Sequence, residues 1–234
     1  MRHHQPSRTA AGLIAALLLA ACAPTTPVIE ANGPTFDGMV PVRDSGLKEA
    51  WVKPDIDLSG YRQLLLAPVE LQFRAVRPTA GSAVGRSQAK EFPINATDRQ
   101  RFADLVTEVF REELGKSRTM TLATGPGPDV LVVHVALQDI VSRLPPEDAG
   151  RSEIYLDKVG EATLVLELKD AESGETLARA VDRRAADPVD DPGTTVTRVT
   201  TVTAWSEVRR VARRWASTVT TRIDQLHSRG RPAG

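Results

Sequence analysis

Residues 130–141 read VLVVHVALQDIV, an almost uninterrupted apolar run. Leu131, Val133, Val135 and Leu137 alternate along it. Alternate side chains of a strand point to the same face of a sheet, so these four share one face. The run therefore predicts a buried strand, and the segments around it decide the rest of the fold.

A hairpin is predicted after this strand, and another buried strand before it. Residues 162–169 alternate apolar and polar, residues 172–174 (Glu-Ser-Gly) supply a turn, and residues 176–183 return as the partner strand. Residues 61–73 form a further apolar run. Pro68 lacks an amide hydrogen, so we expect this strand to end, bulge or meet a sheet edge there.

Two amphipathic helices are predicted. Thr97 and Gln100 have the spacing of a capping box, and apolar residues at helical spacing follow until Gly115. The second helix spans about residues 204–227. Its apolar residues follow one another at intervals of three or four and are Trp205, Val208, Ala212, Trp215, Val219, Ile223 and Leu226.

These segments predict an α/β (α+β) fold, with one mixed sheet of about five strands and two main amphipathic helices packed on it. Residues 119–123 are expected to add a short strand. Residues 77–93 and 185–203 are small, polar or rich in proline, and we expect loops there.

The first 21 residues have the layout of a secretory signal peptide. Arg2 and Arg8 precede an apolar stretch over residues 10–21, and Cys22 follows it directly. The residues Leu-Ala-Ala-Cys at 19–22 resemble the lipobox of bacterial lipoproteins. That resemblance implies cleavage before Cys22 and lipid attachment to its thiol. The alternative is an ordinary cleaved signal with an incidental cysteine.

The mature chain is expected to comprise a tether and one globular periplasmic domain. Residues 22–45 contain the lipidated cysteine and a proline-rich segment whose root-mean-square span as a flexible coil would be roughly 26 Å, and residues 46–230 form the domain. No later apolar run approaches the length of a transmembrane helix, so attachment would be by lipid alone. Ala23 follows the cysteine in place of the aspartate that marks inner-membrane retention in enterobacterial lipoproteins. By that resemblance we expect the outer membrane.

Composition excludes several classes of function. The chain has 30 basic and 30 acidic residues, whereas a nucleic-acid-binding domain would be strongly basic. After signal removal only His134 and His227 remain as histidines. His134 is expected to be a hydrogen-bonded structural residue, and His227 to interact with the negative end of a helix dipole. A serine–lysine pair stays open, but no motif points to one. We predict no catalytic residues, no metal site and no cofactor.

Two short motifs have some features of ligand sites. Residues 125–128 read Gly-Pro-Gly-Pro, and prolines have no amide hydrogen to offer a phosphate, so we interpret them as a turn. Asp187, Asp190 and Asp191 beside Gly193 could hold calcium, but their spacing fits no known loop motif. An exposed acidic turn is the favoured interpretation.

Four arginines on the second predicted helix form a candidate partner-binding face. They repeat four residues apart, and like charges at that spacing repel each other. An anionic partner, such as an acidic protein or a phosphorylated lipid headgroup, could offset the repulsion, and so could a carboxylate-bearing loop of this chain. A solvated helix face is the alternative. The four are Arg209, Arg210, Arg213 and Arg214.

Several of these segments resemble a known family. Residues 127–141 and 160–178, with Trp51-Val52-Lys53-Pro54 and the arginine-rich run up to Trp215, resemble a family of bacterial lipoproteins classified as a domain of unknown function. The resemblance covers about residues 36–228 and transfers no catalytic residue. The order of elements is further similar to the TolB amino-terminal fold, which the curli secretion lipoprotein shares.

The sequence supports a non-catalytic, lipid-anchored binding or scaffolding module on the periplasmic side of the outer membrane. Its expected partner is an envelope protein or an anionic lipid. Two alternatives stay open. One is a hydrolase of envelope polymers, which would need two carboxylates roughly 5–10 Å apart in a cleft. The other is a ring-forming secretion or assembly subunit.

Overall fold

The computed structural model describes residues 27–33, 35–76, 91–144, 154–156, 158–187 and 197–229. The signal peptide, Cys22, residues 77–90 of the expected first loop, and the acidic residues Asp190 and Asp191 lie outside these ranges.

A mixed sheet of nine strands forms the centre of the described fold. Three of its strands, β4, β5 and β6, run parallel to their partners, and the other pairings are antiparallel. In spatial order the strands are β1 (Val28–Ile29), β2 (Val40–Arg43), β3 (Glu49–Val52), β10 (Thr176–Ala186), β9 (Gly160–Asp170), β7 (Val130–Ser142), β4 (Gln63–Leu66) and β6 (Thr121–Leu122).

The long strand β7 holds the sheet together. β9 pairs along one edge of it, and β4 and then β5 (Glu70–Phe73) pair along the other. Pro68 lies between β4 and β5, which confirms the predicted break of that apolar run. A separate two-stranded ribbon joins β8 (Ile154–Leu156) to β11 (Thr197–Val199).

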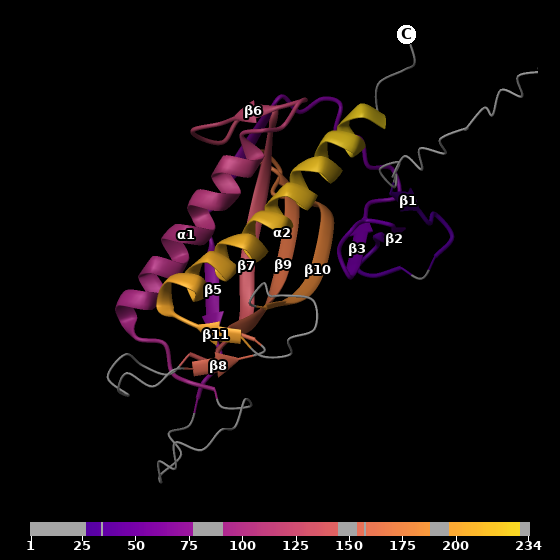
Figure 1. The fold of residues 1–234 in the computed structure, drawn as a ribbon. Coiled ribbons are helices and arrows are strands. Elements are labelled where there is room, and N and C mark those ends of the chain that lie inside the picture. Colours follow the sequence, from indigo (N-terminus) through magenta and orange to yellow (C-terminus); the bar gives the residue numbers. More distant parts are fainter. Residues whose placement is uncertain are drawn as a thin grey trace, which may run out of the picture.

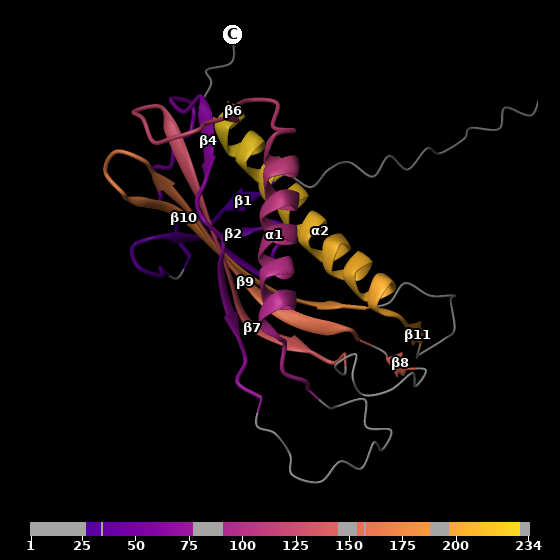
Figure 2. The same cartoon turned by 90° about the vertical axis from the view of Figure 1, so that its left-hand side faces the viewer.

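Both helices pack on the same side of the sheet (Figures 1 and 2). α1 spans Ala96–Leu114, and α2 spans Thr201–Arg229. Within the part of the chain that the structure describes, neither helix is apolar enough along its length to span a membrane. The fold class is confirmed, with more strands in the sheet than the five expected.

The core lies between the helices and the sheet. Leu131, Val133, Val135 and Leu137 of β7 are all buried, Leu137 to 1% exposure. Leu137 pairs with Leu164 of β9, so the predicted face of both strands is confirmed. The helices complete the core with large apolar side chains, which are Phe110 and Leu114 of α1 and Trp215, Val219 and Ile223 of α2.

The start of α1 differs from the predicted capping box. The N-cap is Asn95, whose side-chain oxygen accepts a 2.8 Å hydrogen bond from the amide of Asp98. Thr97 and Gln100 lie inside the helix. Asparagine is among the strongest N-cap residues, and it comes two residues before the threonine, so the helix begins earlier than expected.

The segment expected to be a tether contains two strands. β1 and β2 both fall within residues 22–45, and the amide of Glu30 donates a 2.9 Å hydrogen bond to the carbonyl of Pro41. β2 pairs with β3, so these strands extend the sheet. The described fold thus includes two strands that precede the expected domain boundary at residue 46.

The predicted loop at residues 185–203 is also shorter than expected. β10 continues to Ala186, β11 occupies Thr197–Val199, and α2 begins at Thr201. The hairpin turn between β9 and β10 is as predicted, and Gly174 there adopts φ +71°, a conformation that favours glycine.

Candidate functional site

One face of the sheet carries no helix among the described residues, and we name it the open face. Figure 2 shows both helices on the other side of the sheet. The open face consists of the side chains of β3, β7, β9 and β10 that alternate away from α1 and α2. On β9 the buried residues alternate with partly exposed ones, which lie on the open face because successive strand side chains point to opposite sides. Ionic and aromatic side chains occupy this face.

A bulge in β7 places a carboxylate on the open face. Gln138 pairs with Thr163 and Val141 with Glu161, so Asp139 and Ile140 share the space opposite one residue of β9. Asp139 adopts φ +52°, a left-handed conformation that aspartate tolerates better than most residues. Bulges of this kind redirect a side chain, and here the bulge redirects Asp139.

Two arginines hold the Asp139 carboxylate. Arg74, just after β5, donates two hydrogen bonds of 2.6 Å from its Nε and Nη2 atoms. Arg183 of β10 donates a third, of 2.7 Å, from Nη1. The hydrogen bond from Arg74, followed by that from Arg183, lowers the pKa of Asp139 to about 2.

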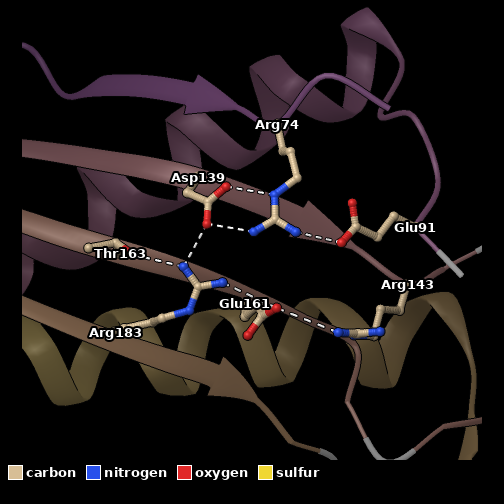
Figure 3. A network of polar contacts seen from close by, with 7 residues as sticks. All are labelled: Arg74, Glu91, Asp139, Arg143, Glu161, Thr163 and Arg183. Atoms are coloured by element: carbon tan, nitrogen blue, oxygen red, sulfur yellow. Dashed lines mark hydrogen bonds and ion pairs between the residues drawn. The ribbon is translucent and has the colours of Figure 1, made fainter. Parts of the chain in front are cut away.

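Four further residues extend these contacts into the Asp139 network (Figure 3). Glu161 lies 3.2 Å from Arg183 Nη2 and 3.5 Å from Arg143 Nη2. Arg74 Nη1 lies 2.5 Å from Glu91, and Arg183 Nη1 donates to Thr163 at 3.1 Å. The network links β7, β9 and β10 with the two segments that flank residues 77–90.

The chemistry of the network favours fixed charge over acid–base catalysis. A carboxyl group with a pKa of about 2 is ionised at neutral pH and cannot donate a proton there. Asp139 and Glu161 share the guanidinium of Arg183, and neither lines the two hollows described below. Asp139 and Glu161 therefore act together as fixed charges held by Arg183.

A second group on the open face, the Phe36 cluster, is aromatic and basic. The rings of Phe36 and Trp51 lie 5.2 Å apart, and the guanidinium carbon of Arg179 lies 5.5 Å from the Phe36 ring centroid. Glu167 accepts a 2.9 Å hydrogen bond from Arg179 Nε and lies 2.8 Å from Lys169 Nζ. Phe36 remains 46% exposed, although a large apolar side chain would be expected to be buried.

The predicted arginine face is largely paired within the chain. Arg209 Nη1 lies 3.1 Å from Glu108, and Arg213 lies 3.5 Å from Glu112. Both carboxylates belong to α1. The expected repulsion between the arginines is thus offset by carboxylates of this chain, although they come from a helix and not from a loop.

The other two arginines line a hollow of about 180 Å³ beside the end of β10. Arg210 lies 2.6 Å from Glu207 and donates a 2.6 Å hydrogen bond to the carbonyl of Asp187. Arg214 is exposed and shares this hollow with Arg184. A contact of the arginine face with an anionic partner stays a prediction, and Arg214 is the arginine best placed for it.

A wider groove of about 730 Å³ separates the first turns of α1 and α2. Arg101 stacks over the ring of Trp205, 4.5 Å from its centroid, and Asp104 and Glu108 also line the groove. Its charges are of both signs, and Glu108 pairs there with Arg209.

The histidines have structural contacts. His134 Nε2 lies 3.1 Å from Glu70 Oε1 on the neighbouring strand. His227 is buried, and its Nε2 atom lies 3.1 Å from the carbonyl oxygen of Tyr61, which anchors the end of α2 to the start of β4. Within the described ranges, no group of histidine, cysteine or acidic side chains is arranged to hold a metal ion.

Sequence reasoning missed both groups on the open face. The available signal was Asp139, a charged residue inside an otherwise apolar strand. Arg179 and Arg183 also alternate with buried residues along β10, as side chains on the exposed face of a strand do. Asp139 contacts Arg74, and Arg179 contacts Phe36. In each pair the two residues are more than 60 positions apart along the chain, so no local spacing connects them.

The family of proteins of unknown function DUF3313 matches residues 34–219, which include the sheet from β2 onward, α1 and most of α2. The chain belongs to the DUF3313 family. This confirms the predicted membership in a family of unknown function, while the similarity to the TolB amino-terminal fold stays a prediction. A search of curated proteins finds no match.

Solved structures give weaker likenesses to this DUF3313 member. A candidate lipoprotein of Caulobacter crescentus CB15 is 12% identical, with 75% of this chain and 96% of that one covered and a TM-score of 0.35. The PelC dodecamer of Paraburkholderia phytofirmans is 12% identical, with coverage of 74% and 91% and a TM-score of 0.36. A DUF330 protein of Xanthomonas campestris is 15% identical, with coverage of 72% and 86% and a TM-score of 0.35. These values are too low to inform function.

Proposed function

We propose that this DUF3313 protein is a non-catalytic, lipid-anchored envelope protein that binds a partner protein with the open face of its sheet. The anchor is Cys22, and the location is the periplasmic side of the outer membrane. The signal-like residues 1–21 and the lipobox-like residues 19–22 support the anchor, and Ala23 supports the location.

The observation that carries the binding proposal is the exposed Phe36 ring on Trp51, with Arg179 beside it. Aromatic residues and arginine are enriched at the centres of protein interfaces, where they provide large contact area at low entropic cost. A membrane or a small anion would not require this combination. The partner is therefore a protein that covers Phe36 with apolar surface.

The Asp139 network supports the same interpretation. Its charges are held in place by mutual hydrogen bonds, so a partner meets a preorganised pattern of charge and loses little entropy in ordering it. Fixed charges of both signs provide specificity more than affinity. Phe36 is thus the expected source of affinity, and Asp139 with its arginines is the expected source of selectivity.

Site-specific photo-crosslinking in intact cells tests the proposal. A photoreactive residue at Val181, on the open face two residues from Arg179, should yield one discrete protein adduct. The same residue at Arg111, exposed on α1, should not give that adduct.

Phe36→Ala should abolish the Val181 adduct, whereas Val202→Ala, at another exposed apolar residue, should leave it intact. Equal adducts from Val181 and Arg111, or an adduct that persists in Phe36→Ala, would contradict the proposal. Unchanged thermal melting of each variant serves as the control for folding.

A further inference from the structure

The start of the described fold lies beside the end of α2 (Figure 1). The carbonyl of Pro27 accepts a hydrogen bond from Arg229, in the last turn of α2. The next residue, Val28, pairs with Arg43 of β2. Further along α2, Arg222 donates a 2.7 Å hydrogen bond to the carbonyl of Ser45. These contacts fix Pro27 to one end of the molecule.

The distance from this point to the proposed lipid anchor is limited by chain length. Five residues lead from Cys22 to Pro27, and a fully extended chain of that length spans at most about 18 Å. α2 has 29 residues, which corresponds to a length of about 43 Å. The link is therefore less than half as long as α2, and it keeps the Pro27 end of the molecule near the bilayer.

The surface at this end is suited to phospholipid headgroups. Val28 is 46% exposed, the Arg43 side chain is 70% exposed, and Arg229 is exposed. Three carboxylates are nearby: Glu30 pairs with Arg43, Asp44 lies close enough to Arg222 to interact with its charge, and Asp57 lies near His227. Exposed arginines next to a bilayer are attracted to anionic lipids, and an exposed valine can contact the interface.

We infer that Val28, Arg43 and Arg229 form a membrane-facing surface that rests on anionic phospholipid headgroups. This inference rests on the lipid anchor at Cys22 that is part of the proposed function. It sets an orientation: the end of α2 at Arg229 faces the bilayer, and the beginning of α2 faces away from it.

The orientation bears on the partner of the arginine face. Arg214 precedes Arg229 by 15 residues, which corresponds to about 22 Å along the helix. That distance is more than twice the screening length of about 8 Å at physiological salt. Arg214 is therefore too far from the supporting bilayer to be held by its headgroups, and an anionic partner of Arg214 would be a protein.

Fluorescence quenching in vesicles tests the orientation on the full lipidated protein. Cys22 is the only cysteine, and acylation consumes its thiol, so an introduced cysteine is the only labelling site. Ser228→Cys and Ser206→Cys place the same label on exposed positions near the two ends of α2. The vesicles contain phosphatidylethanolamine, phosphatidylglycerol and a lipid with a quencher on its headgroup.

The label at residue 228 should be quenched several-fold more strongly than the label at residue 206. Replacing both Arg43 and Arg229 by glutamine should reduce this ratio, as should omission of phosphatidylglycerol. The control pair Arg101→Gln and Arg111→Gln, on α1, should leave the ratio unchanged. Far-UV circular dichroism melts show whether each variant is folded.

Mass spectrometry of the amino-terminal peptide separates the possible failures. A peptide without acyl chains on Cys22 would overturn the proposed lipid anchor itself. An acylated protein with equal quenching at residues 228 and 206 would overturn the orientation. A ratio that does not respond to loss of Arg43 and Arg229 in folded protein, or to loss of phosphatidylglycerol, would overturn the role of anionic headgroups.

Discussion

Trp215 of α2 donates its indole N–H to the carboxylate of Asp182 in β10 at 2.8 Å, and both side chains are buried. Asp182 also accepts hydrogen bonds from Arg184 Nε at 2.6 Å and from the amide of Lys48 at 3.1 Å. One carboxylate thus joins a helix, a central strand and the segment before β3.

Removing this carboxylate is expected to destabilise the fold. Asp182→Ala leaves the buried indole N–H of Trp215 and the Nε–H of Arg184 without their acceptor, and we expect a loss of about 3 kcal/mol in the free energy of unfolding. Urea denaturation followed by tryptophan fluorescence measures it. Asp55→Ala, at an exposed aspartate, is the matched control. Equal midpoints for the two variants would show that Asp182 has no such role.

Leu137 tests the register of the central strand. It is 1% exposed beneath the helices, and Leu137→Ala should lower the free energy of unfolding by about 2–5 kcal/mol because a buried leucine leaves a cavity. Gln138→Ala changes the exposed next residue and should stay within about 0.5 kcal/mol. Chemical denaturation compares them, and similar losses at both positions would refute the register.

The sequence contained enough information to predict β7, the β9–β10 hairpin and α2. Each is long, and its burial follows a period that the sequence repeats several times, as with Leu131, Val133 and Val135. β1 and β2 lacked such a signal. They have two and four residues, β2 includes Pro41, and their stability comes from pairing with each other and with β3.

The open face could not be predicted for a different reason. Asp139 reaches the open face through a bulge. The bulge interrupts the alternation by which successive side chains of β7 point to opposite faces of the sheet. The partners of Asp139 are Arg74, just after β5, and Arg183 of β10, which lie 65 and 44 residues away in sequence, so tertiary structure alone brings them together. At α1 the predicted cap residues Thr97 and Gln100 lie inside the helix, because Asn95 caps it through the amide of Asp98.

Asp139 makes the stability of the protein sensitive to acid. Its pKa in the fold is about 2, below the ordinary value of 3.8, because Arg74 and Arg183 favour the ionised form. A lowered pKa contributes stability above the ordinary value, and this contribution is lost as pH falls through the folded value. The free energy of unfolding should therefore fall between about pH 4 and pH 2.

The Asp139→Asn variant isolates this contribution. It should be less stable than the parent protein at neutral pH and should show a flatter decline over the acid range. Asp55→Asn provides the control at an exposed aspartate. Thermal melts from pH 2 to pH 7 give the comparison. A parallel decline in the parent protein and in Asp139→Asn would mean that the network does not perturb this carboxyl group.

Arg213 and Arg214 are adjacent but should respond differently to charge reversal. Arg213→Glu places a carboxylate against Glu112 and the buried Glu113, and we expect a loss of about 1 kcal/mol at the contact between α1 and α2. Arg214→Glu lies on the exposed side and should change stability by less than about 0.5 kcal/mol. Thermal melting at two salt concentrations distinguishes them, and equal shifts would contradict the assigned contacts.

Lipid attachment at Cys22 is the most direct test of the account as a whole, because the envelope location and the orientation at the membrane both depend on it. Cells that express the protein are labelled with a clickable palmitate analogue, and the parent protein is compared with Cys22→Ser. We predict label on the parent protein, and no label with accumulation of uncleaved precursor for Cys22→Ser, because serine lacks the acylated thiol. Equal label and processing in both proteins would contradict the account.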